Sequence, residues 1–255
     1  MSAPIFYLPL EELQSISVGD TIDLTGEEGH HAKNVKRLEL GEAINLADGN
    51  GLRVQGSVSA ILEGGLSVKA RSINMESSST NIILVQALAK HDRDLLAIET
   101  ATELGVAGVI PWSADRSIVR WKKERIAKFY AKWENVVKAA AKQARRATIP
   151  EVYELHFSKD LVKLIEKDAT QEAVAIVLHE SATQQLSSLI EENFSNVLPH
   201  TVYLVVGPEG GISDREVELF HDAGAKVAVL GQDILRSSTA GSAAIAVIKT
   251  VQNLW

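Results

Sequence analysis

Near its C-terminus the chain carries two short apolar runs that each end in a glycine-bearing loop. The first run, Val202 to Val206, leads into Gly-Pro-Glu-Gly-Gly at 207–211, and the second, Lys226 to Leu230, leads to Gly231. Such β-branched runs are typical of buried parallel strands, and the Ser213 capping box between them begins a helix. We expect the two strands to be adjacent. Open α/β sheets bind ligands at the carboxyl ends of their strands, so the two loops predict one crevice.

The rest of the chain after residue 82 alternates between strand and helix patterns, which favours an α/β domain with a mostly parallel sheet. Pro111 is expected to stop the strand that begins at Val106, because proline lacks the backbone N–H that a strand donates. We expect strands over 82–88, 106–110 and 173–178, and helices over 94–104, 121–144, 158–167, 184–193 and 239–254.

Residues 1–73 form a separate β-rich region in which apolar and polar residues alternate. The turn sequence Asp-Gly-Asn-Gly at 48–51 separates two of its strands, and a helix is expected over 27–40. The polar stretch 74–81 reads as a linker to the α/β domain.

Composition excludes several kinds of site. The 255-residue chain has no cysteine, which excludes disulfides and thiolate metal sites. His30 and His31 are neighbours and project in different directions on a helix, so no metal site is predicted. With no secretion signal and no apolar run of about 18 residues, the sequence favours a cytoplasmic protein that does not cross a membrane.

The net charge of −7 is unevenly distributed. Residues 116–146 hold eleven basic residues against two acidic ones, a local footprint that suits a polyanion such as RNA. The alternative interpretation is a solvated helix face. Aromatic residues in the same stretch, including Phe129, Tyr130 and Trp133, follow helical spacing and are interpreted as core packing rather than as base-stacking platforms.

The two closing motifs, at 203–220 and 230–248, resemble those of the SPOUT-class RNA methyltransferases, and more narrowly those of the RsmE family. The run 30–51, the element from Lys90 to Ser117 and the pair His179-Glu180 are similar to that family as well. The resemblance covers nearly the whole chain. It implies a PUA-like β-barrel over 1–73, a linker over 74–81 and a SPOUT domain over 82–255 with a C-terminal trefoil knot.

The family resemblance implies an activity: S-adenosylmethionine-dependent methylation of uridine N3 in 16S rRNA of the small ribosomal subunit, by a homodimer without a metal. Arg236 would then stabilise the uridinate, and Glu209 or water would accept the proton. The residues expected to bind the cofactor are Leu178, His179, Gly207, Pro208, Glu209, Gly211, Leu230, Gly231, Ile234, Leu235, Arg236, Thr239 and Ala240. Those expected to bind RNA are His31, Lys33, Lys36, Arg37, Lys90, Arg93, Arg116, Arg145 and Arg146.

Three positions depart from the family pattern: Lys142 and Ser238 replace glutamate, and Asp233 replaces arginine. Two alternatives stay open. Another SPOUT enzyme would methylate a ribose 2′-hydroxyl, which fragment masses of the modified RNA would reveal. A non-catalytic RNA-binding or ribosome-assembly protein would fail to bind S-adenosylmethionine. A dehydrogenase is disfavoured because the sequence has no GxGxxG fingerprint.

Overall fold

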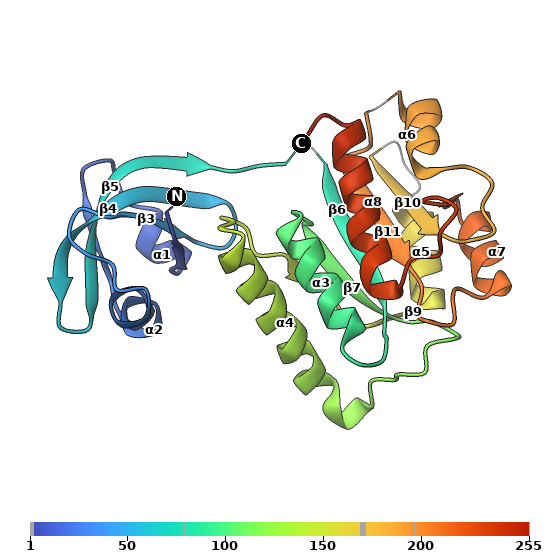
Figure 1. Cartoon of the computed structure of the whole chain (residues 1–255), viewed down its shortest axis with the longest axis horizontal. Coiled ribbons are helices and arrows are strands. Elements are labelled where there is room, and N and C mark those ends of the chain that lie inside the picture. The colour runs from blue at the N-terminus through green and yellow to red at the C-terminus, as the bar shows by residue number, and fades with distance from the viewer. Residues whose placement is uncertain (1–2, 79, 169–171, 196, 255) are drawn as a thin grey trace. The chain divides into compact units, whose positions relative to one another are not determined.

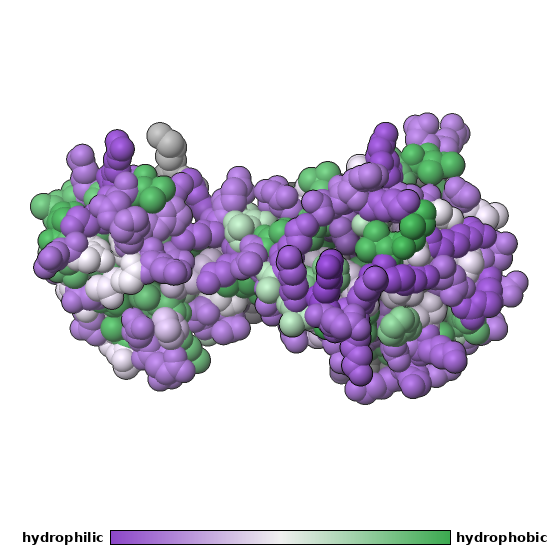
Figure 2. All heavy atoms as spheres, turned by 90° about the horizontal axis from the view of Figure 1, so that it is seen from below, coloured by the Kyte–Doolittle hydropathy of each residue, from purple (hydrophilic) through white to green (hydrophobic). Residues whose placement is uncertain are grey.

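The structure is a computed structural model that describes residues 3–78, 80–168, 172–195 and 197–254 (Figure 1). Its chain forms two compact units. The first unit comprises Met1–Ser78 together with Ala141–Ile149, and the second comprises Ser79–Ala140 together with Pro150–Trp255. Hydrophilic side chains cover much of the face shown in Figure 2, where apolar side chains gather in separate patches.

The first unit is built on a five-stranded sheet of order β1-β3-β4-β5-β2, in which only β1 and β3 pair in parallel. All five strands contribute side chains to one core, among them Phe6, Leu24, Leu46, Val54 and Val68, so the sheet curls around it. Two irregularities in the β4–β5 register help this bend. The strands are β1 (Ile5–Tyr7), β2 (Thr21–Leu24), β3 (Ala43–Ala47), β4 (Leu52–Leu62) and β5 (Gly65–Met75).

The helix expected over 27–40 is shorter in the structure. α2 (Gly26–His30) continues as a π-helix over His31–Val35, and short α1 (Leu10–Leu13) precedes both. Arg37 adopts a left-handed conformation with φ 54°, and the amide of Leu38 donates to the carbonyl of Ala32. This geometry closes a helix C-terminus, which is why the helical pattern does not reach residue 40.

Residues 141–149 cover the outer face of β1 and β3. Side chains alternate along β1, so Phe6 enters the core while Ile5 and Tyr7 face outward and pack against Ala147. The Tyr7 hydroxyl donates to the carbonyl of Arg146 at 2.8 Å. The first unit is therefore completed by a segment that lies far along the chain.

The second unit contains a parallel sheet of order β12-β10-β11-β6-β7-β8, with β9 also pairing with β7. Its strands are β6 (Asn81–Ala87), β7 (Gly108–Ser113), β8 (Glu151–Val152), β9 (His156–Phe157), β10 (Ala173–Leu178), β11 (Thr201–Val206) and β12 (Lys226–Ala228). Its helices are α3 (Arg93–Glu103), α4 (Ile126–Gln143, whose end lies in the first unit), α5 (Ser158–Asp168), α6 (Leu186–Phe194), α7 (Asp214–Asp222) and α8 (Ser237–Val251). A 3-10 turn over Lys123–Arg125 precedes α4, so the helix expected from residue 121 begins five residues later.

Helices cover both faces of this sheet. Side chains from α5 and α7, including Leu161, Ile165 and Phe220, pack on one face against Val85, Trp112 and their neighbours. α3 and α8 lie side by side on the other face, where both contact β6 (Figure 1). The α/β class and the mostly parallel sheet are thus confirmed. The trefoil knot stays a prediction.

Pro111 does not stop its strand, because β7 runs through it to Ser113. The carbonyl of Val109, two residues earlier, accepts from the amide of Tyr153, so residue 111 faces the same edge of the strand. On that edge β8 ends at Val152 and β9 begins at His156. Proline's missing N–H falls in the gap between these short strands, where no partner is needed.

The strands that end in the two glycine loops are not adjacent as expected. β10 lies between β11 and β12 and pairs in parallel with both. The isolated apolar runs could not reveal this, since strand order depends on how the connections cross the sheet. The loop after β10 consequently joins the other two loops at one edge of the sheet.

Candidate active site

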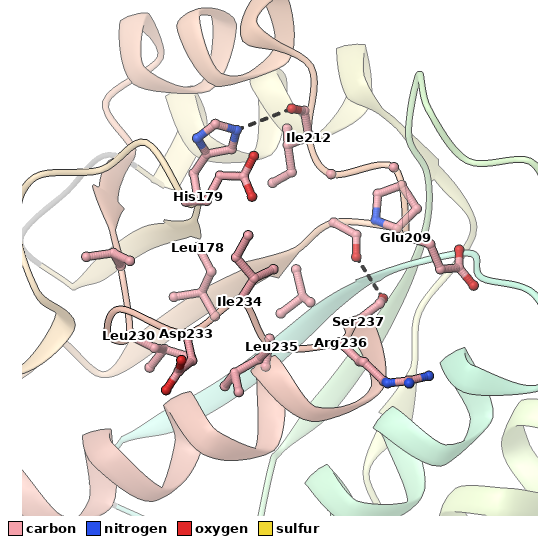
Figure 3. Close-up of a pocket in the computed structure, with 18 of the residues that line it drawn as sticks. Leu178, His179, Glu209, Ile212, Leu230, Asp233, Ile234, Leu235, Arg236 and Ser237 are labelled. Atoms are coloured by element: carbon pink, nitrogen blue, oxygen red, sulfur yellow. Dashed lines mark hydrogen bonds between the residues drawn. The ribbon is translucent and has the colours of Figure 1, made fainter.

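A pocket of about 720 Å³ lies at the carboxyl ends of β10, β11 and β12 (Figure 3). Three chain segments form it: residues 178–180 after β10, 206–212 after β11 and 228–237 after β12. Arg93, Arg116 and Ala240 complete the lining. The volume suits a small organic ligand, because such sites usually measure roughly 300–1,000 Å³.

The loop after β11 is a tight turn that requires glycine at two positions. Gly211 has φ +71°, a conformation that other residues rarely adopt, and its amide donates to the carbonyl of Pro208 at 2.9 Å. A side chain at Gly207 would approach Cγ1 of Ile212 to 2.7 Å. The loop then enters α7 through the expected capping box of Ser213 and Glu216, which is confirmed.

Glu216 is a fully buried carboxylate that joins three segments around this loop. Its Oε1 accepts from the amide of Asp115 at 2.8 Å and from the Ser158 hydroxyl at 2.6 Å, and its Oε2 accepts from the amide of Ser213 at 3.2 Å. These hydrogen bonds satisfy a charge that burial would otherwise penalise. Glu216 therefore fixes the start of α5 and of α7 relative to the end of β7.

Arg116 extends this support to the pocket itself. Its Nη1 donates to the carbonyls of Gly210 at 3.2 Å and Ile212 at 3.3 Å. The neighbouring Asp115 pairs with Arg215 at 2.6 Å, and the hydrogen bond from Arg215 lowers the pKa of the Asp115 carboxyl. The β7–α4 connection is thus attached to the glycine loop by Arg116 and to the start of α7 by the pair of Asp115 and Arg215.

The loop after β12 presents its backbone to the pocket. Within the described residues, the amides of 230–235 donate to no other group of the protein. A Cβ atom on Gly231 would meet nothing within 4 Å, so the space beside it is open. Ile234 is 79% exposed, and Leu235 is 38% exposed. The loop therefore offers unpaired hydrogen-bond donors next to apolar side chains, which suits a flat heterocyclic ligand.

A buried hydrogen-bond chain joins the first turn of α8 to the loop after β11. Gln86 on β6 donates through Nε2 to the Ser237 hydroxyl at 2.9 Å. That hydroxyl donates to the carbonyl of Gly207 at 2.7 Å (Figure 3). Gln86 is fully buried, and its Oε1 has no partner among the described residues. Neither Gln86 nor Ser237 was singled out from the sequence, because nothing local marks a polar residue inside an apolar strand as part of a site.

The charged groups of the lining balance: three arginines face three carboxylates. Glu209 Oε1 accepts from the backbone amide of Lys90 at 2.9 Å and lies 3.5 Å from Nη1 of Arg93. Arg236 lies on the same side of the pocket as Glu209, and Asp233 lies on the opposite side (Figure 3). No described residue pairs with the exposed Arg236 guanidinium. A free cation and a positioned carboxylate thus share one end of the pocket.

His179 connects the β10 loop to the first glycine loop. Its Nε2 lies 3.3 Å from the carbonyl of Ile212, which can only accept a hydrogen bond, so this nitrogen carries the proton. Nδ1 then accepts from Ser181, whose hydroxyl is 2.7 Å away. These contacts hold the pocket wall between the β10 loop and the first glycine loop.

Twelve of the thirteen residues predicted to bind the cofactor line this one pocket, and the exception is Thr239 on the exposed side of α8. Arg93 and Arg116, predicted as RNA ligands, line the pocket as well. The backbone of Lys90 is fixed by Glu209. The sequence therefore predicted that the two glycine loops share one pocket. It did not predict that Arg93 and Arg116 line this pocket, because their contacts are with residues about 100 positions away in the chain.

The remaining predicted RNA ligands lie in the first unit. The Lys33 ammonium donates to the carbonyls of Leu62 and Glu63 in the β4–β5 turn. Lys142 pairs with Glu28 at 2.5 Å and lies 3.1 Å from Nδ1 of His31. Burial and this neighbouring ammonium lower the pKa of His31, which keeps its ring neutral near pH 7.

Arg146 is engaged through both backbone and side chain, since its Nη2 donates to the Thr148 hydroxyl at 3.0 Å. Burial lowers the pKa of its guanidinium. The carbonyl of Arg145 accepts from Arg53 at 2.8 Å. Lys36 and Arg37 are exposed.

In the part of the chain that the structure describes, no three His, Cys, Asp or Glu side chains converge as a metal ion would need. The described helices are also all too short or too polar for a membrane crossing.

Two family models match the chain: an RNA methyltransferase PUA domain over residues 24–70 and an RNA methyltransferase domain over residues 76–249. Among curated proteins, ribosomal RNA small subunit methyltransferase E of Mycobacterium tuberculosis (strain CDC 1551 / Oshkosh) is 35% identical, covering 100% of this chain and 94% of the relative. The Bacillus subtilis (strain 168) protein of the same name is 28% identical over 92% of each chain.

Two solved structures resemble the whole chain. Ribosomal RNA small subunit methyltransferase E from Neisseria gonorrhoeae, bound to S-adenosylmethionine, has a TM-score of 0.80 and 29% identity, covering 100% of this chain and 98% of that one. A putative methyltransferase from Legionella pneumophila in complex with S-adenosylmethionine has a TM-score of 0.78 and 27% identity, covering 98% of both chains.

Proposed function

Because the chain belongs to the RsmE family of ribosomal RNA small subunit methyltransferases, we propose that it methylates N3 of a uridine in 16S rRNA, with S-adenosylmethionine as the methyl donor. The observation that carries this proposal is the convergence of the loops 207–212 and 230–235 on one pocket. Relatives of similar structure hold S-adenosylmethionine, and the pocket has the volume and the free amides for such a ligand.

We assign the methyl donor to this pocket on three grounds. The unpaired amides of 230–235 suit the polar edge of an adenine, and Ile234 and Leu235 suit its faces. The open space beside Gly231 lets a ring approach the backbone closely. The balanced charge of the lining tolerates a sulfonium cation, which a lysine-rich phosphate site would repel. When bound, S-adenosylmethionine supplies an electrophilic methyl group.

The acceptor chemistry requires that uridine N3 lose its proton, because its lone pair is otherwise delocalised. Arg236, exposed and free of a protein partner in the described chain, can stabilise the negative charge that develops on the uracil oxygens. Glu209 is held by the amide of Lys90 and by Arg93 through Oε1, which leaves Oε2 to accept the N3 proton directly or through water. The two residues occupy the same end of the pocket, as one reacting base requires (Figure 3).

The substrate would be held by positive charge on both units. Arg116 and the basic residues that follow it, Arg120 to Lys132, belong to the second unit, and Lys36 and Arg37 are exposed on the first. Contacts between such cations and phosphates supply affinity without reading sequence. A small ribosomal subunit as substrate places the reaction in the cytoplasm.

We further propose a homodimer. Ile234 and Leu235 border the pocket with exposed apolar surface, and a second copy would cover such a surface. Light scattering measures the mass in solution directly, and a monomer at micromolar concentration would contradict this part of the proposal.

The test of the function is methylation of small ribosomal subunits purified from a strain that lacks this enzyme, followed by digestion and mass analysis of nucleosides. The expected product is 3-methyluridine. A 2′-O-methylated nucleoside would assign the ribose alternative. No methylation, together with no binding of S-adenosylmethionine at millimolar concentration, would assign a non-catalytic RNA-binding protein.

A further inference from the structure

A second groove of the second unit lies between the first turns of α4 and the short edge strands β8 and β9. Its walls are largely apolar and aromatic, and its lining is Trp121, Lys123, Ile126, Tyr130, Val152, Glu154, Leu155 and Phe157. None of these residues belongs to the pocket described above. The function proposed so far gives this groove no role.

The aromatic residues of the groove differ in their burial. Trp121 is buried: its ring stacks on Phe129 at 5.3 Å and meets Trp133 edge-on at 5.6 Å. Phe157 is 55% exposed, although folding normally hides a ring of this size. The pattern in the sequence therefore predicted the packing of the α4 aromatics correctly, but it did not indicate Phe157.

Phe157 is nevertheless held in a fixed place. Its strand β9 pairs with β7, where it aligns with Ser113, and its amide donates to Oδ2 of Asp160 at 3.0 Å. The opposite wall is fixed by a hydrogen bond between the amide of Leu155 and the Tyr130 hydroxyl. An exposed ring on a rigid backbone is an arrangement that can stack a base at little entropic cost.

Unpaired positive charge lies at the α4 side of the groove, where Lys123 is part of the lining and Lys122 and Arg125 are close along the chain. Lys122, Lys123 and Arg125 are exposed, and no described residue forms an ion pair with any of them. Glu154 is the one carboxylate in the lining. The start of α4 points downward in Figure 1 and toward the viewer in Figure 2, where long hydrophilic side chains lie beside apolar patches. This combination complements an aromatic base attached to a phosphate.

The groove is connected to the active-site pocket by one rigid stretch of chain. The β7–α4 connection contributes Arg116 to the pocket and Trp121 to the groove. Arg120 fastens it, donating through Nη1 to the Ser113 hydroxyl at 3.0 Å and to the carbonyl of Ala114 at 2.6 Å. A strand of RNA whose target base enters the pocket can follow this basic connection to the groove.

We propose that the groove binds a nucleotide of the RNA substrate that flanks the target, with its base stacked on Phe157 and its phosphate held by Lys122 and Lys123. This inference rests on the proposed function, since it takes the RNA substrate as given. It adds a binding site outside the reaction pocket.

The test measures the Kd of the full-length protein for small ribosomal subunits from a strain that lacks the enzyme. For Phe157→Leu, which keeps apolar volume but removes the aromatic face, we expect Kd to rise about tenfold, within the range of base–aromatic stacking. Phe157→Tyr keeps the face and is expected to bind within about twofold of wild type. Unchanged affinity for S-adenosylmethionine in both variants verifies that the fold is intact.

A paired charge test uses Lys122→Ala with Lys123→Ala, which should weaken binding and flatten its salt dependence. The matched control, Lys163→Ala with Lys167→Ala, removes two exposed cations from α5 and should change neither. Equal Kd values for wild type and Phe157→Leu would overturn the inference. The inference would also be overturned if Phe157→Leu changed the mass of the protein in solution but left subunit binding unchanged. The groove would then be an interface with another protein chain.

The experiment measures binding, so it is independent of the methylation reaction. If the wild-type protein binds subunits without methylating them, the proposed reaction is wrong, but the comparison with Phe157→Leu still tests the groove. Failure of the wild type to bind small subunits would refute both.

Discussion

The Ser237 hydroxyl donates to the carbonyl oxygen of Gly207 at 2.7 Å, and this bond ties the first turn of α8 to the glycine loop after β11. Gln86 completes the chain from the sheet beneath. The pocket is therefore held from three directions: by this buried chain, by Arg116 and by His179. Such fixed walls place a ligand without paying for loop ordering at the moment of binding.

Replacing Ser237 by alanine should weaken the affinity for S-adenosylmethionine about 3- to 10-fold. A typical hydrogen bond contributes about 0.5–1.5 kcal/mol, and the loss also removes one of the two hydrogen bonds that the buried Gln86 amide donates. Calorimetric titration measures the change. Thr239→Ala, two residues further on and outside the pocket lining, is the matched control and should bind normally. Equal affinities for both variants would show that the chain does not support the site.

Gly231→Val should abolish binding of S-adenosylmethionine while leaving the melting temperature near that of wild type. The added Cβ would meet no protein atom within 4 Å, and Gly231 lines the pocket, so we expect the side chain to fill ligand space rather than strain the fold. Gly64→Val is the control, because Gly64 also faces open space but lies in the first unit. Full cofactor affinity in the Gly231 variant would place the ligand elsewhere.

Arg236→Ala should reduce kcat by at least about 100-fold with little change in cofactor affinity, since removing one group that stabilises a developing anion typically costs this much. Arg236→Lys, which keeps the charge but not the planar donor pair, should recover part of the rate. Single-turnover methylation of small subunits separates this effect from binding. Wild-type turnover by the alanine variant would remove Arg236 from the mechanism.

Asp94, buried at the start of α3, gives the fold a specific pH dependence. Burial raises the pKa of its carboxyl from 3.8 to about 6. The folded state therefore binds this proton more tightly than the unfolded state, and its stability falls as pH rises from about 4 to about 6.

Asp94→Asn should remove that fall, so the variant should gain stability relative to wild type across this pH range, by on the order of 2–3 kcal/mol. Urea unfolding at pH 4, 5, 6 and 7 measures the difference. Asp92→Asn should change the pH dependence much less, because the Asp92 charge is only a lesser cause of the raised Asp94 pKa and its pairing with Lys132 is screened by solvent. A stability difference that does not change with pH would contradict the assignment.

The sequence predicted what depends on local chemistry. The capping box at Ser213 and Glu216, the strand Ala173–Leu178 and the shared pocket of the two glycine loops are all confirmed. It was wrong about Pro111, whose position beside a gap between two short strands is a property of the sheet and not of the residue. It also placed β11 and β12 side by side, although β10 separates them.

Dependence on distant partners also explains why several residues predicted to bind RNA have other contacts in the structure. Positive charge and the family resemblance marked Lys33, Arg93, Arg116 and Arg146, but their roles depend on partners distant in sequence. Lys33 closes a turn, and Arg116 supports the glycine loop. Gln86 and Phe157 carried no local signal, since a glutamine in a strand and a phenylalanine before a helix are ordinary residues in isolation.

The attachment of residues 141–149 to β1 and β3 has a consequence for biosynthesis. Ile5 and Tyr7 acquire their packing partner Ala147 only after β6, α3, β7 and α4 have been translated. The outer face of β1 and β3 therefore stays exposed to solvent while the ribosome synthesises the residues up to 149. A truncated gene product ending at Ser78 would expose that apolar surface permanently, and it should aggregate unless the missing nonapeptide is supplied in trans.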